Sequence, residues 1–252
     1  MNINTSIEYD PDYVRAKAPI WKRRLHRYFR AQINGIENCP HTPFLAVGNH
    51  SGGILIPDTL IWLSAYHEAQ REPPLLTLAH DAFFTMYPTK ISRWAKRFGA
   101  IRAHHTQALH ALKQGYAVQV YPGGDDDACR PFSKRNYIEF AGRMGYIRLA
   151  QEAKVPIVPI VSHGAHKSLI ILRSGKRLAA WLGTDSQFRL RTFPLSFCAP
   201  WGLWLGPMPG YIPFPTKITV KVCPPISSTG DPRVIDRMVR KTMQAALNQR
   251  CI

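Results

Sequence analysis

Short apolar runs and segments with helical spacing alternate along most of this chain. Runs rich in aliphatic side chains and bounded by turn residues predict buried strands, and they cover residues 44–47, 75–79, 117–121, 157–161 and 218–222. Segments with helical periodicity lie between them, over residues 59–69, 90–98, 105–114 and 146–153. This alternation predicts an α/β fold in which a mostly parallel sheet is flanked by helices.

Helices are also predicted near both ends of the chain. Gly230-Asp231-Pro232 combines a stop, a cap and a first-turn proline, so the last helix should run from Pro232 to about Gln249. Near the N-terminus, the apolar residues between Pro19 and Ile33 recur at helical spacing, and basic residues fall largely on the other faces. Such an amphipathic helix suits either an anionic membrane surface or docking onto the core. We therefore predict an N-terminal helical segment over residues 1–38 and a second domain over residues 39–252.

The first predicted strand ends in a polar turn that carries a candidate base. The apolar run Phe44–Val47 gives way to Gly48, Asn49 and His50, and two further glycines follow. Asp58 lies downstream, where its carboxylate could hold one imidazole nitrogen and leave the other free to take a proton. Two alternatives stay open: His50 is an ordinary loop residue, or another carboxylate such as Asp81 serves it.

Two later segments place glycines and cations at the ends of other strands. Tyr121-Pro122-Gly123-Gly124 follows the third predicted strand and leads into three aspartates, which we expect to form a solvated turn, and then Arg130. Arg143 precedes the helix that feeds the strand Val155-Pro-Ile-Val-Pro-Ile160. Sites in parallel sheets lie beyond the carboxyl ends of the strands, so His50 and Gly123 should lie at one edge.

In this order, the three segments resemble the conserved blocks of the lysophospholipid acyltransferase superfamily of glycerolipid acyltransferases, and the resemblance covers about residues 44–222. Three features differ from the usual pattern. Asp58 follows His50 by eight residues rather than five, Gly123 stands where the family usually has Glu, and the second block is blurred within residues 99–105. The Pro-Gly-Gly form is similar to that of the neutral-lipid branches and of a bacterial subgroup with Asn-His-Ser-Gly-Gly.

The resemblance implies a membrane-associated O-acyltransferase. Such an enzyme moves a fatty acyl group from acyl-CoA or acyl-ACP to the hydroxyl of a lysophospholipid or other glycerolipid, such as 1-acylglycerol-3-phosphate. His50 would be the general base and Asp58 its partner. The implied substrate-binding residues are Asn49, Gly123, Gly124, Arg130 and Arg143. No cofactor beyond the thioester co-substrate is expected. The chain lacks a Gly-x-Ser-x-Gly nucleophile elbow, which disfavours a covalent acyl-enzyme.

Other function classes remain open at this point. One alternative acceptor is a neutral lipid, of the diacylglycerol or fatty-alcohol type. An alternative of another class is a non-catalytic basic protein that binds lipid or nucleic acid, with His50 structural.

The net charge limits which classes of partner are expected, and the cysteines indicate whether disulfides or zinc are expected. The 252-residue chain carries a formal net charge of +17, which calls for an anionic partner. The cations are spread without a nucleic-acid motif, so we expect a membrane lipid surface and acidic substrates rather than nucleic acid. The five cysteines are odd in number and form no Cys-x-x-Cys pair, which argues against a disulfide framework and against zinc. No metal is expected at His104 and His105 or at His163 and His166.

One long uncharged segment bears on localisation. Residues 192–216 could span a bilayer by length, but six prolines interrupt them. Their aromatic residues suit a bilayer interface, the wall of an acyl-chain tunnel, or a buried loop. The polar residues 1–13 do not resemble a signal peptide. We therefore expect peripheral or monotopic attachment to the cytoplasmic face of a membrane.

Overall fold

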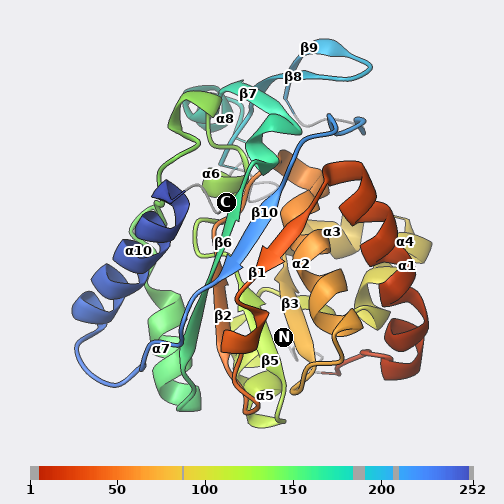
Figure 1. The fold of residues 1–252 in the computed structure, drawn as a ribbon. Helices are drawn as coiled ribbons and strands as arrows, with labels where there is room; N and C mark the ends of the chain where they lie inside the picture. The colour runs from red at the N-terminus through yellow and green to blue at the C-terminus, as the bar shows by residue number, and fades with distance from the viewer. Residues whose placement is uncertain (1–5, 87, 184–190, 207–209, 250–252) are drawn as a thin grey trace.

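The computed structural model describes residues 6–86, 88–183, 191–206 and 210–249. Seven strands form its central sheet: β1 (Gln32–Asn34), β2 (Leu45–Gly48), β3 (Leu75–Ala79), β4 (Ala100–Arg102), β5 (Ala117–Val120), β6 (Ile157–His163) and β10 (Thr219–Val222). They are ordered β1-β10-β6-β2-β5-β3-β4 (Figure 1). All neighbours are parallel except β10 and β6. The predicted mostly parallel sheet is confirmed.

Helices cover both faces of this sheet (Figure 1). One layer contains α1 (Pro11–Phe29), α2 (Pro57–Glu68), α3 (Asp81–Met86) and α4 (Thr89–Arg97), and the other contains α5 (His105–Lys113), α7 (Gly145–Ala153) and α10 (Pro232–Asn248). Two short helices, α6 (Gly124–Ala128) and α8 (Lys176–Trp181), lie at one end of the sheet, and 3₁₀ turns span Ile36–Asn38, Gly53–Leu55, Phe132–Lys134 and Ala165–Lys167.

The residues of each strand divide between two cores. Leu45 and Val47 pack in the cluster that faces α5, α7 and α10, whereas Phe44 and Ala46 pack in the cluster that faces α1 and α2. Successive side chains of a strand point to opposite faces, so a strand buried on both sides reads as a continuous apolar run. This is why the sequence pattern identified the central strands.

Apart from the N-terminal helix, the predicted elements match the structure to within a few residues, but some elements were missed. β1 and β4 are three residues long, too short to produce a period. β4 lies within residues 99–105, where the family's second block is blurred. Both strands lie at the edges of the sheet.

A second, smaller sheet was not predicted. It is antiparallel and contains β7 (Ile170–Arg173), β8 (Leu195–Cys198) and β9 (Gly202–Leu205). The last two strands lie within the uncharged segment of residues 192–216, of which residues 207–209 lie outside the described residues. Pro194 and Pro200 flank β8 rather than interrupt it, so its ladder keeps its backbone donors.

The N-terminal helix differs from the prediction of residues 19–33. It begins at Pro11, because Asp10 caps it by accepting the Tyr13 N–H at 2.9 Å. It ends before Arg30, whose left-handed backbone stops the helix. Ile33 lies in β1, which pairs with β10.

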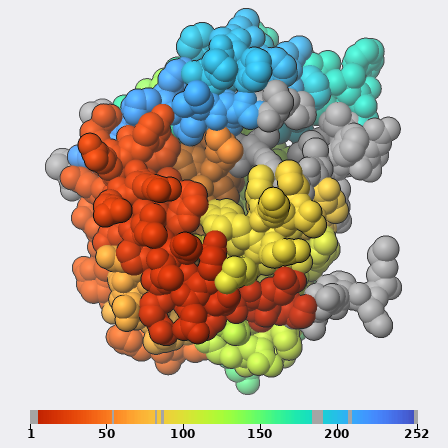
Figure 2. Space-filling model, turned by 90° about the vertical axis from the view of Figure 1, so that its right-hand side faces the viewer, coloured from red at the N-terminus to blue at the C-terminus, as the bar shows by residue number. Residues whose placement is uncertain are grey.

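The same helix packs on the protein along its length. Val14, Ala18 and Phe29 are buried, and the Trp21 ring lies 5.4 Å from that of Trp94 in α4. Figure 2 shows α1 laid across this face beside the residues of α4. Its apolar stripe therefore contacts the core, and its outer side is basic and solvated.

Within the described residues, no helix is long and apolar enough to cross a membrane.

Candidate active site

His50 follows the carboxyl end of the central strand β2. The preceding Asn49 is buried, and both ends of its amide bond the backbone of β6. Its Nδ2 donates to the Ser162 carbonyl at 2.9 Å, and its Oδ1 accepts the Ser162 N–H at 2.8 Å. Asn49 thus holds the end of β2 against β6 and sets the direction in which the chain leaves the sheet. The His50 side chain is 12% exposed.

The loop after His50 folds back and brings Asp58 to the imidazole. His50 Nδ1 lies 3.5 Å from Asp58 Oδ1, which is longer than a hydrogen bond but close enough for a strong charge interaction. Asp58 is buried in the first turn of α2 and accepts the backbone N–H groups of Ser51 at 2.9 Å and Thr59 at 2.8 Å. Asp81, the alternative carboxylate, pairs with Arg102 at 2.9 Å and with His104 at 3.2 Å.

Two glycines allow this return path. Gly52 and Gly53 both have left-handed backbone conformations, and a Cβ on Gly53 would lie 2.3 Å from Leu169 Cδ2. The Tyr211 hydroxyl, which follows the small sheet in the chain, donates to the Gly52 carbonyl and accepts the Leu55 N–H. The segment that follows the small sheet therefore holds the loop between His50 and Asp58.

Tyr121 forms a wall beside the imidazole. Its ring stacks on that of His50 with centroids 4.5 Å apart, and its hydroxyl accepts the Thr59 Oγ1–H at 2.8 Å. Gly48 leaves room for this ring, because a Cβ there would lie 2.5 Å from Tyr121 Cε1. Burial raises the pKa of Tyr121 well above its usual value, so the phenol stays neutral.

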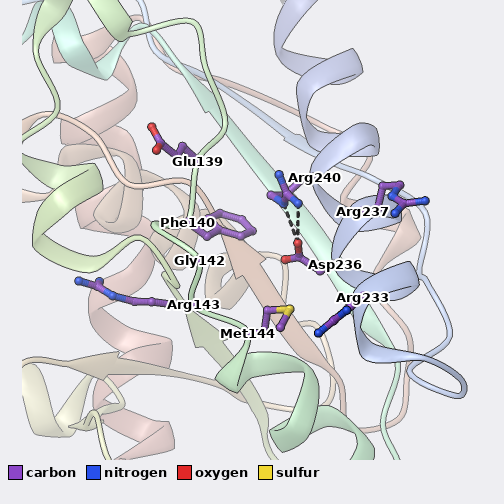
Figure 3. Close-up of a pocket in the computed structure, with 9 residues that line it drawn as sticks. All are labelled: Glu139, Phe140, Gly142, Arg143, Met144, Arg233, Asp236, Arg237 and Arg240. Carbon is purple, nitrogen blue, oxygen red and sulfur yellow. Dashed lines mark hydrogen bonds and ion pairs between the residues drawn. The ribbon is translucent and has the colours of Figure 1, made fainter.

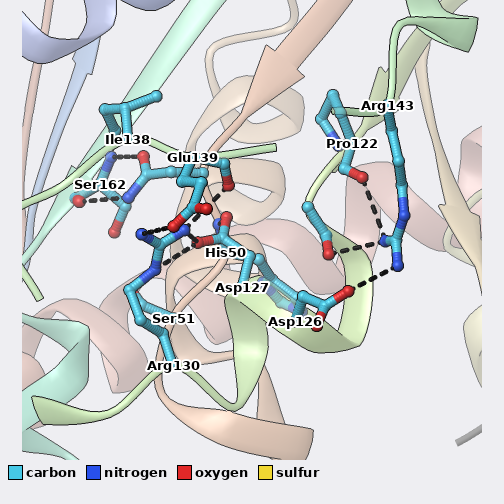
Figure 4. A network of polar contacts seen from close by, with 12 residues as sticks. His50, Ser51, Pro122, Asp126, Asp127, Arg130, Ile138, Glu139, Arg143 and Ser162 are labelled. Atoms are coloured by element: carbon cyan, nitrogen blue, oxygen red, sulfur yellow. Dashed lines mark hydrogen bonds and ion pairs between the residues drawn. The ribbon is translucent and has the colours of Figure 1, made fainter. Parts of the chain in front are cut away.

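Asp127 is a site residue that the sequence analysis missed. It was expected in a solvated turn with its two neighbours, but it is buried and accepts the His50 backbone N–H at 2.6 Å (Figure 4). Its other oxygen accepts two N–H groups of buried Arg130, at 3.1 and 2.6 Å. Asp127 lies one helical turn after Gly123, and a Cβ on Gly123 would lie only 2.4 Å from Asp127 Cβ. The sequence did contain a signal for this buried carboxylate: a glycine stands at the family's Glu position, and an acidic residue follows four residues later.

The carboxylates set the protonation of His50. Burial disfavours the imidazolium, but the charges of Asp58 and Asp127 outweigh burial and raise the pKa of His50 above its usual value. Burial also raises the pKa of the Asp127 carboxyl, against the opposing effects of Arg130 and the His50 N–H.

Arg130 and Arg143 are largely engaged by the protein. Arg130 also donates to the Glu139 carbonyl at 2.9 Å, and its Nη1 is buried without a hydrogen-bond partner. Arg143 donates to the Gly123 carbonyl and to Asp126 Oδ2, both at 2.7 Å (Figure 4). The Gly124 N–H donates to the Tyr121 carbonyl at 3.0 Å. Arg143 thus ties the turn at Gly123 and Gly124 to the loop of residues 139–143.

No metal-type cluster of His, Cys, Asp and Glu occurs among the residues that the structure describes. His166, near the site, is buried, and burial lowers its pKa to about 4. Four described cysteines, Cys39, Cys129, Cys198 and Cys223, are buried and form no disulfide with one another, and Cys251 lies outside the described residues.

The chain is similar to several known proteins. A family model described as "Acyltransferase" matches residues 30–163, more than half of the chain. An uncharacterized protein of Mycobacterium tuberculosis is 28% identical over 251 residues, covering 95% of this chain and 67% of that protein. A mouse protein named "DGAT1/2-independent enzyme synthesizing storage lipids" is 25% identical over 204 residues, covering 81% of this chain and 59% of that protein.

A solved structure has the same fold. The crystal structure of the 1-acyl-sn-glycerophosphate (LPA) acyltransferase PlsC from Thermotoga maritima matches with a TM-score of 0.61 and 16% identity, covering 95% of this chain and 80% of that chain. The enzymatic class follows from the family model, which spans both the His50 turn and the Gly123-Gly124 turn. The chain belongs to the acyltransferase family and is an acyltransferase, so the alternative of a non-catalytic basic protein is set aside.

Proposed function

We propose that this enzyme transfers a fatty acyl group from acyl-CoA or acyl-ACP to the hydroxyl of a glycerolipid, with His50 as the general base. The observation that carries the proposal is the placement of His50 Nδ1 against buried Asp58, 3.5 Å away. This orientation directs the Nδ1 proton to the carboxylate and leaves Nε2 to accept a proton. Catalytic contacts are often long before substrate binds, so this separation suits a pair that tightens in the complex.

The reaction needs no covalent enzyme intermediate. Nε2 would take the proton of the acceptor hydroxyl as its oxygen attacks the thioester carbonyl carbon. The tetrahedral intermediate would then break its C–S bond, and the departing thiolate would take the proton from the imidazolium. The raised pKa of His50 favours the imidazolium in the middle of this cycle. Asp58 would stabilise that charge and fix the tautomer.

Most of the other predicted site residues would position the site, and Arg143 would contact substrate. Asn49 is engaged by β6, and Arg130 by Asp127, so they would act by holding the His50 turn rather than by touching substrate. Gly123 would serve by leaving room for Asp127. Arg143, whose side chain is 32% exposed, is the cation best placed at the Gly123-Gly124 turn to meet an anionic substrate group.

A lysophospholipid such as 1-acylglycerol-3-phosphate is the first candidate acceptor. A neutral lipid of the diacylglycerol or fatty-alcohol type is the second, and two observations favour it. Sequence relatives include enzymes named for storage-lipid synthesis, and Gly123 removes the acidic side chain of the usual third block.

We also propose peripheral attachment to the cytoplasmic face of a membrane. Apolar side chains are exposed on the β8–β9 hairpin, including Phe197, Trp201, Leu203 and Leu205. The net charge of +17 would draw the protein to anionic lipid. Because the apolar stripe of α1 packs on the core, α1 would contribute its basic outer side only.

Thiol release from a long-chain acyl-CoA tests the reaction and the acceptor together. The assay is run with lysophosphatidate, with diacylglycerol and with no acceptor, for the wild type and for His50→Ala. Acceptor-dependent release that His50→Ala removes is expected. Equal release by both proteins would refute the assignment of His50, and the more active acceptor decides between the two lipid classes.

A further inference from the structure

A pocket of about 490 Å³ lies between α10 and the loop of residues 139–144 (Figure 3). Its volume falls within the range of small-molecule sites. Arginines dominate its polar lining: Arg233, Arg237 and Arg240 project from α10, and Arg143 lies at the loop side. None of the residues predicted from the family's first or fourth block lines it.

The arginines of the pocket differ in how their charge is balanced. Arg240 donates to the Asp236 carboxylate at 2.8 and 2.7 Å, and that carboxylate also accepts the Tyr146 hydroxyl at 3.0 Å. Within the described part of the chain, Arg233 and Arg237 form no ion pair, and both are exposed. Arg233 and Arg237 lie one turn apart on α10, so two guanidinium groups are available there to bind an anion.

The pocket also has an apolar wall. The Phe140 ring is buried and lies edge-on to the ring of Tyr146, with centroids 5.7 Å apart. Beside it, the Met144 side chain is partly exposed and lines the same hollow. The exposed thioether of Met144 next to arginines suits a heterocycle that carries phosphates, and the buried Phe140 ring supports the wall from behind.

The wall of this pocket continues into the His50 site. Arg130, which holds Asp127 under His50, donates to the Glu139 carbonyl at 2.9 Å. Its Nη1 is buried without a hydrogen-bond partner and lies 3.8 Å from the Glu139 carboxylate at the pocket rim. On the loop's other side, Arg143 donates to the Gly123 carbonyl. A ligand in the pocket would therefore lie one loop away from the reacting groups.

We infer that this pocket binds the phosphorylated adenosine end of a coenzyme A thioester, with Arg233 and Arg237 on its phosphates and Met144 beside its base. The inference rests on the proposed function for the identity of the donor. The pantetheine arm would pass the 139–144 loop and present the thioester to His50. An exposed pair of arginines against phosphates gives charge-assisted bonds, which are stronger than neutral ones.

Direct binding of adenosine 3′,5′-bisphosphate tests the site without turnover. Calorimetry on the wild type should show binding, and Arg233→Glu with Arg237→Glu should weaken it by about tenfold or more, because two charge-assisted contacts are lost. Lys113→Glu with Lys154→Glu changes the net charge equally at the exposed ends of α5 and α7 and should leave binding unchanged. No binding, or equal losses in both double variants, would overturn the inference. Glycerol 3-phosphate binding that depends on Arg233 and Arg237, in place of the bisphosphate, would assign the pocket to a lipid headgroup instead and also overturn it.

Kinetics separate this inference from the proposed function. The Arg233 and Arg237 double variant should raise KM for acyl-CoA and leave KM for the matching acyl-pantetheine unchanged, because the latter lacks the nucleotide. Equal effects on both donors would overturn the inference while leaving the acyltransferase assignment intact. The opposite result is bisphosphate binding without acyl transfer from acyl-CoA. It would support nucleotide binding in the pocket and refute acyl-CoA as the donor.

Discussion

The backbone N–H of His50 donates to the Asp127 carboxylate at 2.6 Å, across 77 residues of sequence. This bond ties the turn after β2 to the turn after β5, and Arg130 supplies the counter-charge on the far side of the carboxylate. His50 is therefore held in two ways. Asp58 and Tyr121 contact its ring, and Asp127 accepts its backbone N–H.

Replacement of Asp127 by Ala should lower both stability and kcat. Removing one side of this buried pair leaves Arg130 only the exposed Glu139 carboxylate, 3.8 Å away, as a counter-charge. Such a loss costs up to about 3–5 kcal/mol of unfolding free energy. Adding Arg130→Met removes the stranded charge, so stability should partly recover in denaturant unfolding, whereas kcat should stay low because the His50 N–H still lacks its acceptor. A kcat that recovers together with stability would mean that Asp127 has no positioning role.

Replacement of His50 by Ala should lower kcat by about 10²–10⁴-fold with little change in KM, because a general base acts in the transition state. Asp58→Asn should cost less, since it alters the orientation and charge of the imidazole without removing it. Circular dichroism checks that both variants fold. A His50→Ala enzyme within about tenfold of the wild type would exclude His50 as the base.

The pH profile of kcat/KM should report the carboxylates around His50. The base must be neutral, so the rate should rise with pH to a plateau, with a midpoint above 6.5, because Asp58 and Asp127 raise the pKa. Asp58→Asn removes one stabilising charge from the imidazolium, so its midpoint should move to lower pH. An unmoved midpoint in that variant would show that Asp58 does not contact the titrating group.

His67 should make folding sensitive to acid. It is buried among Tyr9, Tyr66 and Phe98, and burial lowers its pKa from 6.5 to about 4. The unfolded chain binds the proton more readily, so stability is lost as pH falls from about 6.5 toward 4, by on the order of 3 kcal/mol in full. His67→Phe should flatten the dependence of unfolding free energy on pH in this window. An unchanged slope would assign the acid sensitivity to other groups.

The exposed side of the β8–β9 hairpin should carry membrane attachment. Leu203 and Leu205 point outward, whereas Trp204 between them packs toward Leu169 and Ile171. Leu203→Ser with Leu205→Ser should therefore reduce flotation with anionic liposomes without loss of thermal stability, and Trp204→Ser should lower stability. Binding by the wild type should weaken as salt rises, because surface charges are screened over about 8 Å near physiological ionic strength. If neither the leucine variant nor salt changes flotation, then neither the hairpin side chains nor surface charge attaches the protein to the membrane.

Much of the central sheet could be predicted from the sequence alone. β2, β3, β5 and β6 are largely buried, so their residues form mostly apolar runs, which end in glycine, proline or polar turns. The edge strands β1 and β4 are too short to show a period. The hairpin of β8 and β9 lies among prolines, which suggested irregular structure because the pattern does not reveal that they flank the strands.

The sequence by itself determined the order of the turns and proposed His50 and Asp58 as a pair, because chain direction in a parallel sheet brings the strand ends to one edge. Only the tertiary structure decided how the charges there pair. A run of three aspartates looks solvated in sequence, yet Asp127 is buried because Gly123 leaves it room and Arg130 balances it. The N-terminal helix makes the same point. Its apolar stripe is equally suited to lipid and to protein, and sequence periodicity cannot distinguish the two. In the structure the stripe packs on α2 and α4, so it contacts the protein core.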